Sequence, residues 1–145
     1  AVAEALISRR ADPNLRRRDG RTAVHEAARR GDTSILEKLQ HGGADLTAVD
    51  NSGNTALHHA CAERGSLAAV EHLLSRGARA DARRGDGRTP LHVACRGHTD
   101  PVPLLRALLR TGHLSPAPLD EQGLTPLMHC AAAGHARGVG PLLRL

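Results

Sequence analysis

The chain contains no phenylalanine, tyrosine or tryptophan, so any hydrophobic interior must be built from leucine, valine, isoleucine, alanine and cysteine. Aromatic rings usually supply much of the buried area of a wide core. A repeat protein tolerates their absence, because each thin repeat packs only against its neighbours. The chain also lacks the rings on which single-stranded bases stack. The composition is therefore compatible with a thin repeat fold, and the lack of aromatic rings weighs against nucleic acid as a partner.

Other features are scarce, and each shortage argues against a class of protein. No apolar run reaches the roughly 18 residues of a membrane helix. The three cysteines are an odd number, which argues against a disulfide framework and favours a reducing compartment, cytoplasmic or nuclear. The motifs Gly-x-Ser-x-Gly, Gly-x-x-x-x-Gly-Lys and His-Glu-x-x-His are absent. We therefore expect an intracellular, monomeric protein without catalytic activity, cofactor or membrane contact.

One stretch of sequence recurs four times. It reads DGRTAVHEAARRGD from Asp19, SGNTALHHACAERGS from Ser52, DGRTPLHVACRGH from Asp86 and QGLTPLMHCAAAGH from Gln122. The threonines of successive copies are 33, 34 and 36 residues apart, a period that indicates a solenoid. Each copy is followed by an apolar segment with the 3-to-4 spacing of a helix, which ends in a turn such as Gly-Ala-Asp.

This order of Gly-x-Thr-Pro-Leu-His, Ala-Ala, glycine, amphipathic segment and Gly-Ala-Asp resembles the ankyrin repeat from end to end. The resemblance implies an all-α solenoid of stacked helix-turn-helix units joined by hairpin-like loops, here called fingers. We expect one domain over residues 1–145, with repeats at about 19–50, 52–84 and 86–120 between partial repeats at 1–18 and 121–145. Leu142, Leu143 and Leu145 would have no further repeat to cover them, so we expect a longer parent protein.

The repeated threonine predicts the start of a helix, because its side chain can cap the first turn and Pro90 or Pro126 fits the next position. The resemblance implies that the histidine three residues later bonds this threonine and nearby backbone. A group repeated in one register is expected to be structural rather than catalytic. In the fourth copy Met128 takes the histidine position. The residues assigned this structural role are Thr22, His25, Thr55, His58, Thr89, His92 and Thr125.

The histidines and cysteines offer metal ligands by type but not by arrangement. His58, His59 and Cys61 lie on one predicted helix, yet a structural zinc ion needs four converging ligands. Equivalent positions of stacked repeats lie side by side instead of around a point. We therefore expect no metal site, buried packing roles for Cys61 and Cys95, and positions on the exposed side of their helices for His59 and His129.

The resemblance also implies a binding face made of the finger tips and the first helix of each repeat. We expect the arginines of this face to be exposed. The candidate binding residues are Arg18, Asp19, Arg21, Glu26, Arg29, Arg30, Asn51, Asn54, His59, Glu63, Asp86, Arg88, Arg96, Gln122, Leu124 and His129.

Nineteen of the twenty basic residues are arginine, and the planar guanidinium matches carboxylates and phosphates. An acidic peptide or phosphopeptide is therefore the sharper hypothesis for the partner. The alternative is a compositional bias toward arginine that only solubilises the surface. The resemblance allows a substrate receptor of a ubiquitin ligase of the SOCS-box type, a regulator of a transcription factor, or a scaffold. Nucleic acid is the rival class of partner.

The third repeat is longer than the first. Thr89 to Gly112 is 23 residues, whereas Thr22 to Gly43 is 21. The extra residues fall around RGHTDPVP, where two prolines oppose continuation of a helix, so we expect a longer connection between the two helices of this repeat.

Asn14 lies in the stretch ADPN, which resembles the site that asparaginyl hydroxylase modifies in ankyrin repeats. The corresponding positions in the next two repeats are Thr47 and Asp81, so Asn14 is the candidate for hydroxylation. The alternative is an asparagine that closes its own turn.

Overall fold

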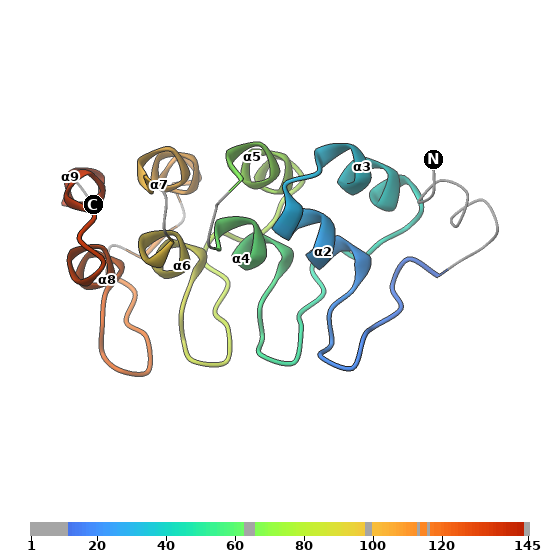
Figure 1. The fold of residues 1–145 in the computed structure, drawn as a ribbon, viewed down its shortest axis with the longest axis horizontal. Coiled ribbons are helices and arrows are strands. Elements are labelled where there is room, and N and C mark those ends of the chain that lie inside the picture. The colour runs from blue at the N-terminus through green and yellow to red at the C-terminus, as the bar shows by residue number, and fades with distance from the viewer. Residues whose placement is uncertain (1–11, 63–65, 98–99, 113, 116, 144–145) are drawn as a thin grey trace.

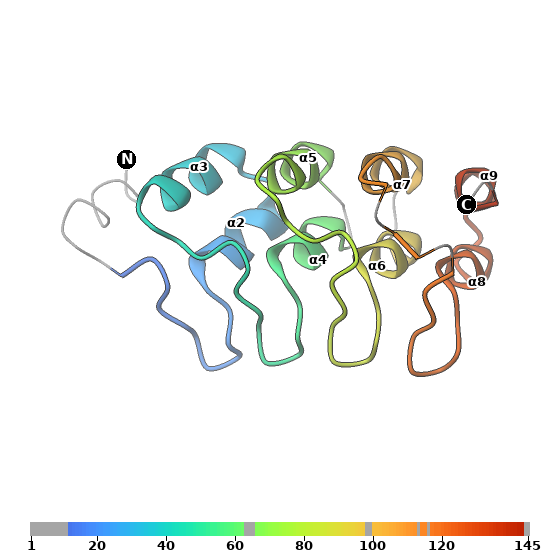
Figure 2. The same cartoon turned by 180° about the vertical axis from the view of Figure 1, so that it is seen from behind.

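The helices of this chain stack in two rows, with long loops projecting from one row (Figures 1 and 2). The computed structural model describes residues 12–62, 66–97, 100–112, 114–115 and 117–143. The first helices, next to the loops, are α2 (Ala23–Arg30), α4 (Ala56–Cys61), α6 (Pro90–Arg96) and α8 (Pro126–Ala132). The second helices are α3 (Thr33–His41), α5 (Leu67–Ser75), α7 (Val102–Leu109) and α9 (Ala136–Leu142). The described residues contain no strand, and the predicted all-helical solenoid is confirmed.

Each first helix begins directly after the repeated threonine, whose extended backbone makes it the N-cap residue. Pro90 and Pro126 are the first helical residues of α6 and α8, where a missing N–H breaks no hydrogen bond. Helix α2 ends at Gly31, which adopts the left-handed conformation with φ of 74°. The helix boundaries therefore follow from the local sequence.

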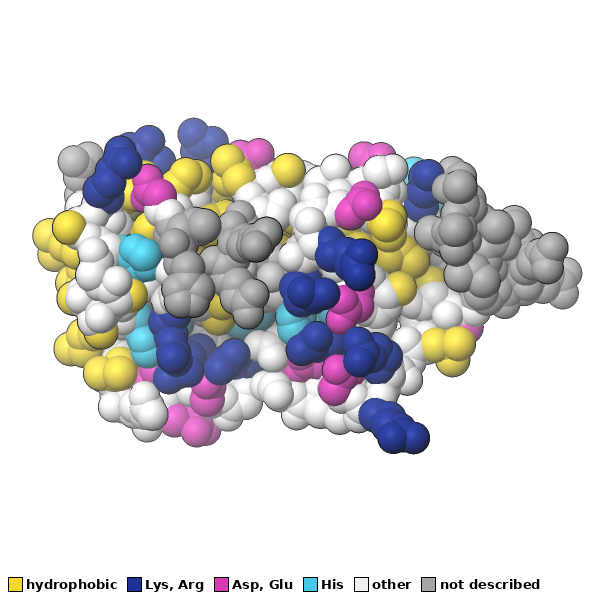
Figure 3. All heavy atoms as spheres, viewed as in Figure 1, with side chains coloured by type: hydrophobic (Ala, Val, Ile, Leu, Met, Phe, Trp, Pro, Cys, Tyr) yellow, Lys and Arg dark blue, Asp and Glu magenta, His cyan; other side chains and the backbone are white. Residues whose placement is uncertain are grey.

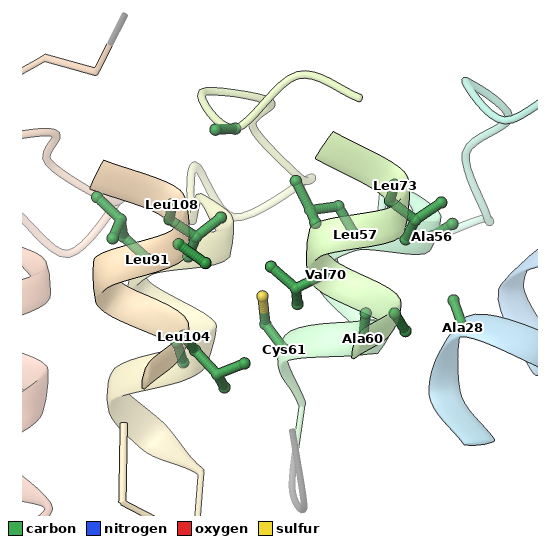
Figure 4. Close-up of a cluster of buried hydrophobic side chains, with 14 of the residues drawn as sticks. Ala28, Ala56, Leu57, Ala60, Cys61, Val70, Leu73, Leu91, Leu104 and Leu108 are labelled. Carbon is green, nitrogen blue, oxygen red and sulfur yellow. The ribbon is translucent and has the colours of Figure 1, made fainter. Parts of the chain in front are cut away.

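The core lies between the two rows of helices and consists of aliphatic side chains. Figure 4 shows Leu57, Cys61 and Leu91 of the first helices beside Val70 and Leu108 of the second helices, and all five are buried. A layer this thin is filled without aromatic rings. The expected burial of the cysteines is confirmed, because Cys61, like Cys95, is a buried free thiol.

The end of the stack differs from expectation at one residue. Leu142 of α9 is buried, because this helix packs on both α7 and α8, so the expectation that nothing covers it was wrong. Leu143 is 67% exposed. Leu145 lies outside the described residues. The second helix expected within residues 1–14 lies mostly outside them as well.

The connection in the third helix pair is longer than that in the first. Residues 97–101 separate α6 from α7, whereas residues 31–32 separate α2 from α3. Pro101 is the N-cap residue of α7 and Pro103 lies in its first turn, where neither interrupts a helical hydrogen bond. The prediction that this connection is longer than the one in the first helix pair is confirmed. The connection in the second pair, residues 62–66, has the same length as that in the third.

The finger tips are tight turns at residues 17–21, 50–54, 84–88 and 120–124. In each tip the N–H of the first residue donates to the carbonyl oxygen of the last, at 2.8–3.0 Å. Neighbouring tips are also joined, for example by the N–H of Gly85 and the carbonyl of Ser52 at 2.8 Å. Gly53 has φ of 77°, and a Cβ atom there would lie 2.8 Å from the nitrogen of Gly85. Position 53 therefore requires glycine for two reasons, the positive φ of the turn and the close approach of the adjoining finger.

Candidate protein-binding face

Three histidines fix the start of their own helix and reach the next finger. The N–H of Thr55 donates to Nδ1 of His58 at 3.2 Å, and Nε2 of His58 lies 3.1 Å from the carbonyl oxygen of Arg88. A backbone N–H can only donate and a carbonyl can only accept, so this ring is neutral and carries its proton on Nε2. His25 and His92 make the same pairs of contacts.

Burial favours the neutral form of these rings. It lowers the pKa of His58 to about 4, although the hydrogen bond to the carbonyl of Arg88 opposes the shift. The pKa values of His25 and His92 are lowered for the same main reason. A proton on Nδ1 would also displace the threonine N–H from that nitrogen. The three rings are therefore part of the scaffold of the face and are neutral at pH 7.

His59 and His129 are buried, at 8% and 6% exposure, so the expectation that they lie on the exposed side of their helices was wrong. Nε2 of His59 lies 2.8 Å from a carboxylate oxygen of Asp50, and Nε2 of His129 lies 2.9 Å from Asp120. Each ring also meets the edge or face of the helix-start histidine of the preceding repeat, with centroids 5.4 and 5.5 Å apart. These buried histidine–aspartate pairs lie at the base of the binding face.

Asp50 and Asp120 also organise their finger tips. Burial alone would raise the pKa of Asp50, but hydrogen bonds from Asn54, His59 and Ser52 outweigh it and lower the pKa to about 2. Burial likewise opposes ionisation of Asp120, yet hydrogen bonds from His129, the N–H of Leu124 and Arg88 hold its pKa well below the usual range. Both carboxylates are therefore charged at neutral pH.

Most arginines of the face are paired with carboxylates. Arg21 and Arg29 both reach Glu26, at 3.3 and 3.0 Å. Arg84 contacts Asp86 at 2.6 Å, and its hydrogen bonds hold the pKa of that carboxyl well below the usual range.

Arg88 is the exception to the expected exposure of these arginines. It lies 3.2 Å from Asp120, and its side chain is only 12% exposed. Arg88 is therefore less exposed than expected, though not fully buried, because it pairs with a buried carboxylate of the next finger.

Arg30 and Arg96 differ from the other arginines that line the two hollows described below. Each is the last residue of its helix, α2 or α6, and each is exposed. Neither forms an ion pair with any part of the chain that the structure describes. Arg18, outside the hollows, is likewise exposed and without an ion pair to the described residues. Figure 3 shows Lys and Arg side chains in a band above the fingers, interspersed with acidic and histidine side chains, and further basic side chains along the opposite edge. Arg30 and Arg96 are thus positive groups of this face that no carboxylate of the described residues neutralises.

Two hollows bring many of the predicted residues together. The first has a volume of about 660 Å³ and the second about 500 Å³. The first is lined by Arg21, Arg29, Arg30, Asn54, His58, His59, Ala62, Ser66, Arg84 and Val93. The second is lined by Arg88, Arg96, Gln122, His129, Ala132 and Ala133.

Other predicted residues lie outside both linings, and some lining residues were missed. Glu63 is outside the described residues. Arg84 and Ser66 line the first hollow but were not predicted. The signal that could have identified Arg84 is the charged residue that recurs five residues before each repeated threonine, at Arg17, Asp50, Arg84 and Asp120. The predicted residues outside the linings are Arg18, Asp19, Glu26, Asn51, Asp86 and Leu124.

Asn14 joins its own turn to the following one. Its side-chain oxygen accepts from the N–H of Asp45 at 2.8 Å, and its side-chain nitrogen donates to the carbonyl of Gly43 at 3.2 Å. The residue is exposed. It therefore links two repeats, a wider role than closing a single turn.

Comparison with protein families agrees with this geometry. The family model described as Ankyrin repeats (3 copies) matches residues 1–84 and 59–144. The chain belongs to the ankyrin-repeat family. Ankyrin repeats generally mediate protein–protein interaction and are typically non-catalytic. Within the described part of this ankyrin stack, no helix is long and apolar enough to cross a bilayer. The same residues hold no group of three or more potential metal ligands.

Proposed function

We propose that this ankyrin stack is a non-catalytic module that binds an acidic segment of a partner protein on the face formed by fingers and first helices. The observation that carries the proposal is the pair Arg30 and Arg96, exposed in two hollows and without an ionic partner among the described residues. A carboxylate or phosphate of the partner can bind them without displacing an internal ion pair. Recognition by an adaptor or a regulator would use this same face.

The strength of the proposed binding depends on several contacts together. One exposed ion pair contributes only about 0–1 kcal/mol. A hollow that excludes part of the water strengthens each pair, since the effective dielectric falls. Compositional bias, the alternative explanation, gives arginine no preferred place. On that account Arg106 and Arg110, which line a separate hollow against α9, would bind acidic segments equally well.

The test compares two double charge reversals in the 145-residue chain. Arg30→Glu with Arg96→Glu removes the unpaired arginines of the two hollows, and Arg106→Glu with Arg110→Glu is the matched control on the second helices. The probe is a fluorescein-labelled glutamate-rich peptide, followed by fluorescence anisotropy at several salt concentrations. We expect at least a tenfold loss of affinity for the first variant only, and binding that weakens with salt. Equal losses in both variants would show that the face has no special role.

A further inference from the structure

The repeats alternate in character along the stack. Counted from the repeated threonine, the preceding residue and the seventh residue after it are Arg21 and Arg29 in the first repeat and Arg88 and Arg96 in the third. The second and fourth repeats carry no arginine at either position. They carry instead the buried pairs of Asp50 with His59 and Asp120 with His129. The pattern of the face therefore has a period of two repeats.

Because of this alternation, the same hollow is built twice. An arginine pair from one repeat, Arg21 with Arg29 or Arg88 with Arg96, forms one wall. The following repeat supplies the edge of a histidine that a buried aspartate holds in place, His59 or His129. It also supplies a small residue at the same position, Ala62 or Ala132, which leaves the hollow open. The shared lining indicates that both hollows suit the same kind of group.

We infer that the two hollows are equivalent anion-accepting sites and that the ligand is one peptide segment with two acidic groups, one for each hollow. This inference rests on the proposed function and adds the number and spacing of the acidic groups. Arg30 in the first hollow and Arg96 in the second supply the unpaired positive charge, from neighbouring rather than identical positions of their repeats. Val93 of α6 lines the first hollow on the side toward the second. Because this side chain is apolar, we expect uncharged residues between the two acidic groups of the peptide.

The geometry of the stack sets the spacing. Packed helices lie about 8–10 Å apart, so sites two repeats apart are separated by about 16–20 Å. An extended chain advances about 3.3 Å per residue. The two acidic residues must therefore stand at least about five or six positions apart in the peptide to reach both hollows. A shorter separation allows only one acidic group to bind, because effective concentration falls to zero when a linker cannot span two sites.

The experiment uses labelled peptides of equal length, measured by fluorescence anisotropy against the 145-residue chain. The spaced peptide has two Glu-Glu pairs joined by about six Ser and Gly residues, and the short peptide has the same two pairs joined directly, so that its outermost glutamates are only about 10 Å apart. A third peptide has one pair replaced by Gln-Gln. We expect the spaced peptide to bind at least tenfold more tightly than the other two. Arg30→Gln and Arg96→Gln should each reduce the affinity for the spaced peptide to that of the other two peptides. Arg106→Gln should leave this affinity unchanged.

The outcomes separate the two proposals. If the spaced and short peptides bind equally, and both lose affinity in the Arg30→Gln and Arg96→Gln variants, the acidic partner stands and the two-site inference is overturned. If no glutamate peptide binds, or if Arg106→Gln weakens binding as much as Arg96→Gln, the proposed function fails as well. Thermal unfolding followed by circular dichroism verifies that each variant retains the stability of the parent chain.

Discussion

The Nε2 atom of His58 lies 3.1 Å from the carbonyl oxygen of Arg88, which is 30 residues further along the chain. The same ring accepts the N–H of Thr55 through Nδ1 at 3.2 Å. One buried side chain therefore starts a helix and bonds the next finger. Because stacked repeats are stabilised by contacts with their neighbours, this histidine acts on two repeats at once.

His58→Ala should destabilise the stack by about 1–3 kcal/mol, since it leaves a backbone N–H and a carbonyl without partners. Met128→Ala is the matched control, because Met128 has the same register in α8 but is 51% exposed. We expect its effect to stay within about 0.5 kcal/mol. Urea unfolding followed by circular dichroism measures both, and a control loss as large as that of His58→Ala would contradict the dual role.

Stability should fall as the pH drops from about 6.5 toward 4. The pKa of His58 is lowered to about 4 in the folded chain, so below its unfolded pKa near 6.5 the unfolded chain takes up a proton that the folded ring does not. This linkage is on the order of 2 kcal/mol at pH 5. Asp50, with its pKa lowered to about 2, stabilises the fold above its ordinary 3.8 and loses that effect only at lower pH.

The pH effect is measured as the urea midpoint between pH 7.5 and pH 5, in the parent chain and in His58→Ala. The parent should lose stability over this interval, and the variant should lose less. Parallel curves would show that His58 is not the group responsible.

Gly53→Ala should cost more than Gly123→Ala. Both glycines have positive φ, 77° and 73°, so each substitution carries a similar backbone strain of about 1–2 kcal/mol. Only at Gly53 would the added methyl group meet a neighbouring backbone, 2.8 Å from the nitrogen of Gly85, whereas nothing lies within 4 Å at Gly123. Equal shifts of the thermal midpoint would show that the fingers do not pack as described.

The three cysteines should resist thiol reagents in the folded chain, because burial raises the pKa of Cys61 to about 12 and Cys95 and Cys130 are equally inaccessible. The sulfur atoms of Cys95 and Cys130 lie 2.6 Å apart as free thiols. Titration with a thiol-specific reagent should give almost no reaction in buffer and three thiols in urea. A count of one in urea would mean that this pair is oxidised.

Much of the scaffold could be predicted because its signals are local. Thr55 and Thr89 mark helix starts through capping chemistry that acts within one turn. Apolar spacing identified the second helices for the same reason. The period of the repeat then gave the stacking direction without knowledge of any particular contact.

The contacts between repeats were harder to predict. Whether Arg88 is free depends on Asp120, which is 32 residues away and lies beside it only after the fingers stack. His59 was expected on the surface because its register faces the fingers, but the carboxylate of Asp50 covers it. Comparing charges at equivalent positions of successive repeats would have revealed the alternation, since Asp50 and Asp120 recur nine residues before a histidine.

The most direct test of the binding face is a nuclear magnetic resonance titration of the isotope-labelled chain with the spaced glutamate peptide, observing the arginine Nε–H signals. We predict saturable shifts at Arg30 and Arg96, with backbone shifts in the finger tips at 50–54 and 120–124. The signals of Arg76, Arg106 and Arg110, which are exposed on the second-helix side, should not move. Shifts confined to these three arginines, or spread equally over all exposed arginines, would contradict a binding site on the fingers and first helices.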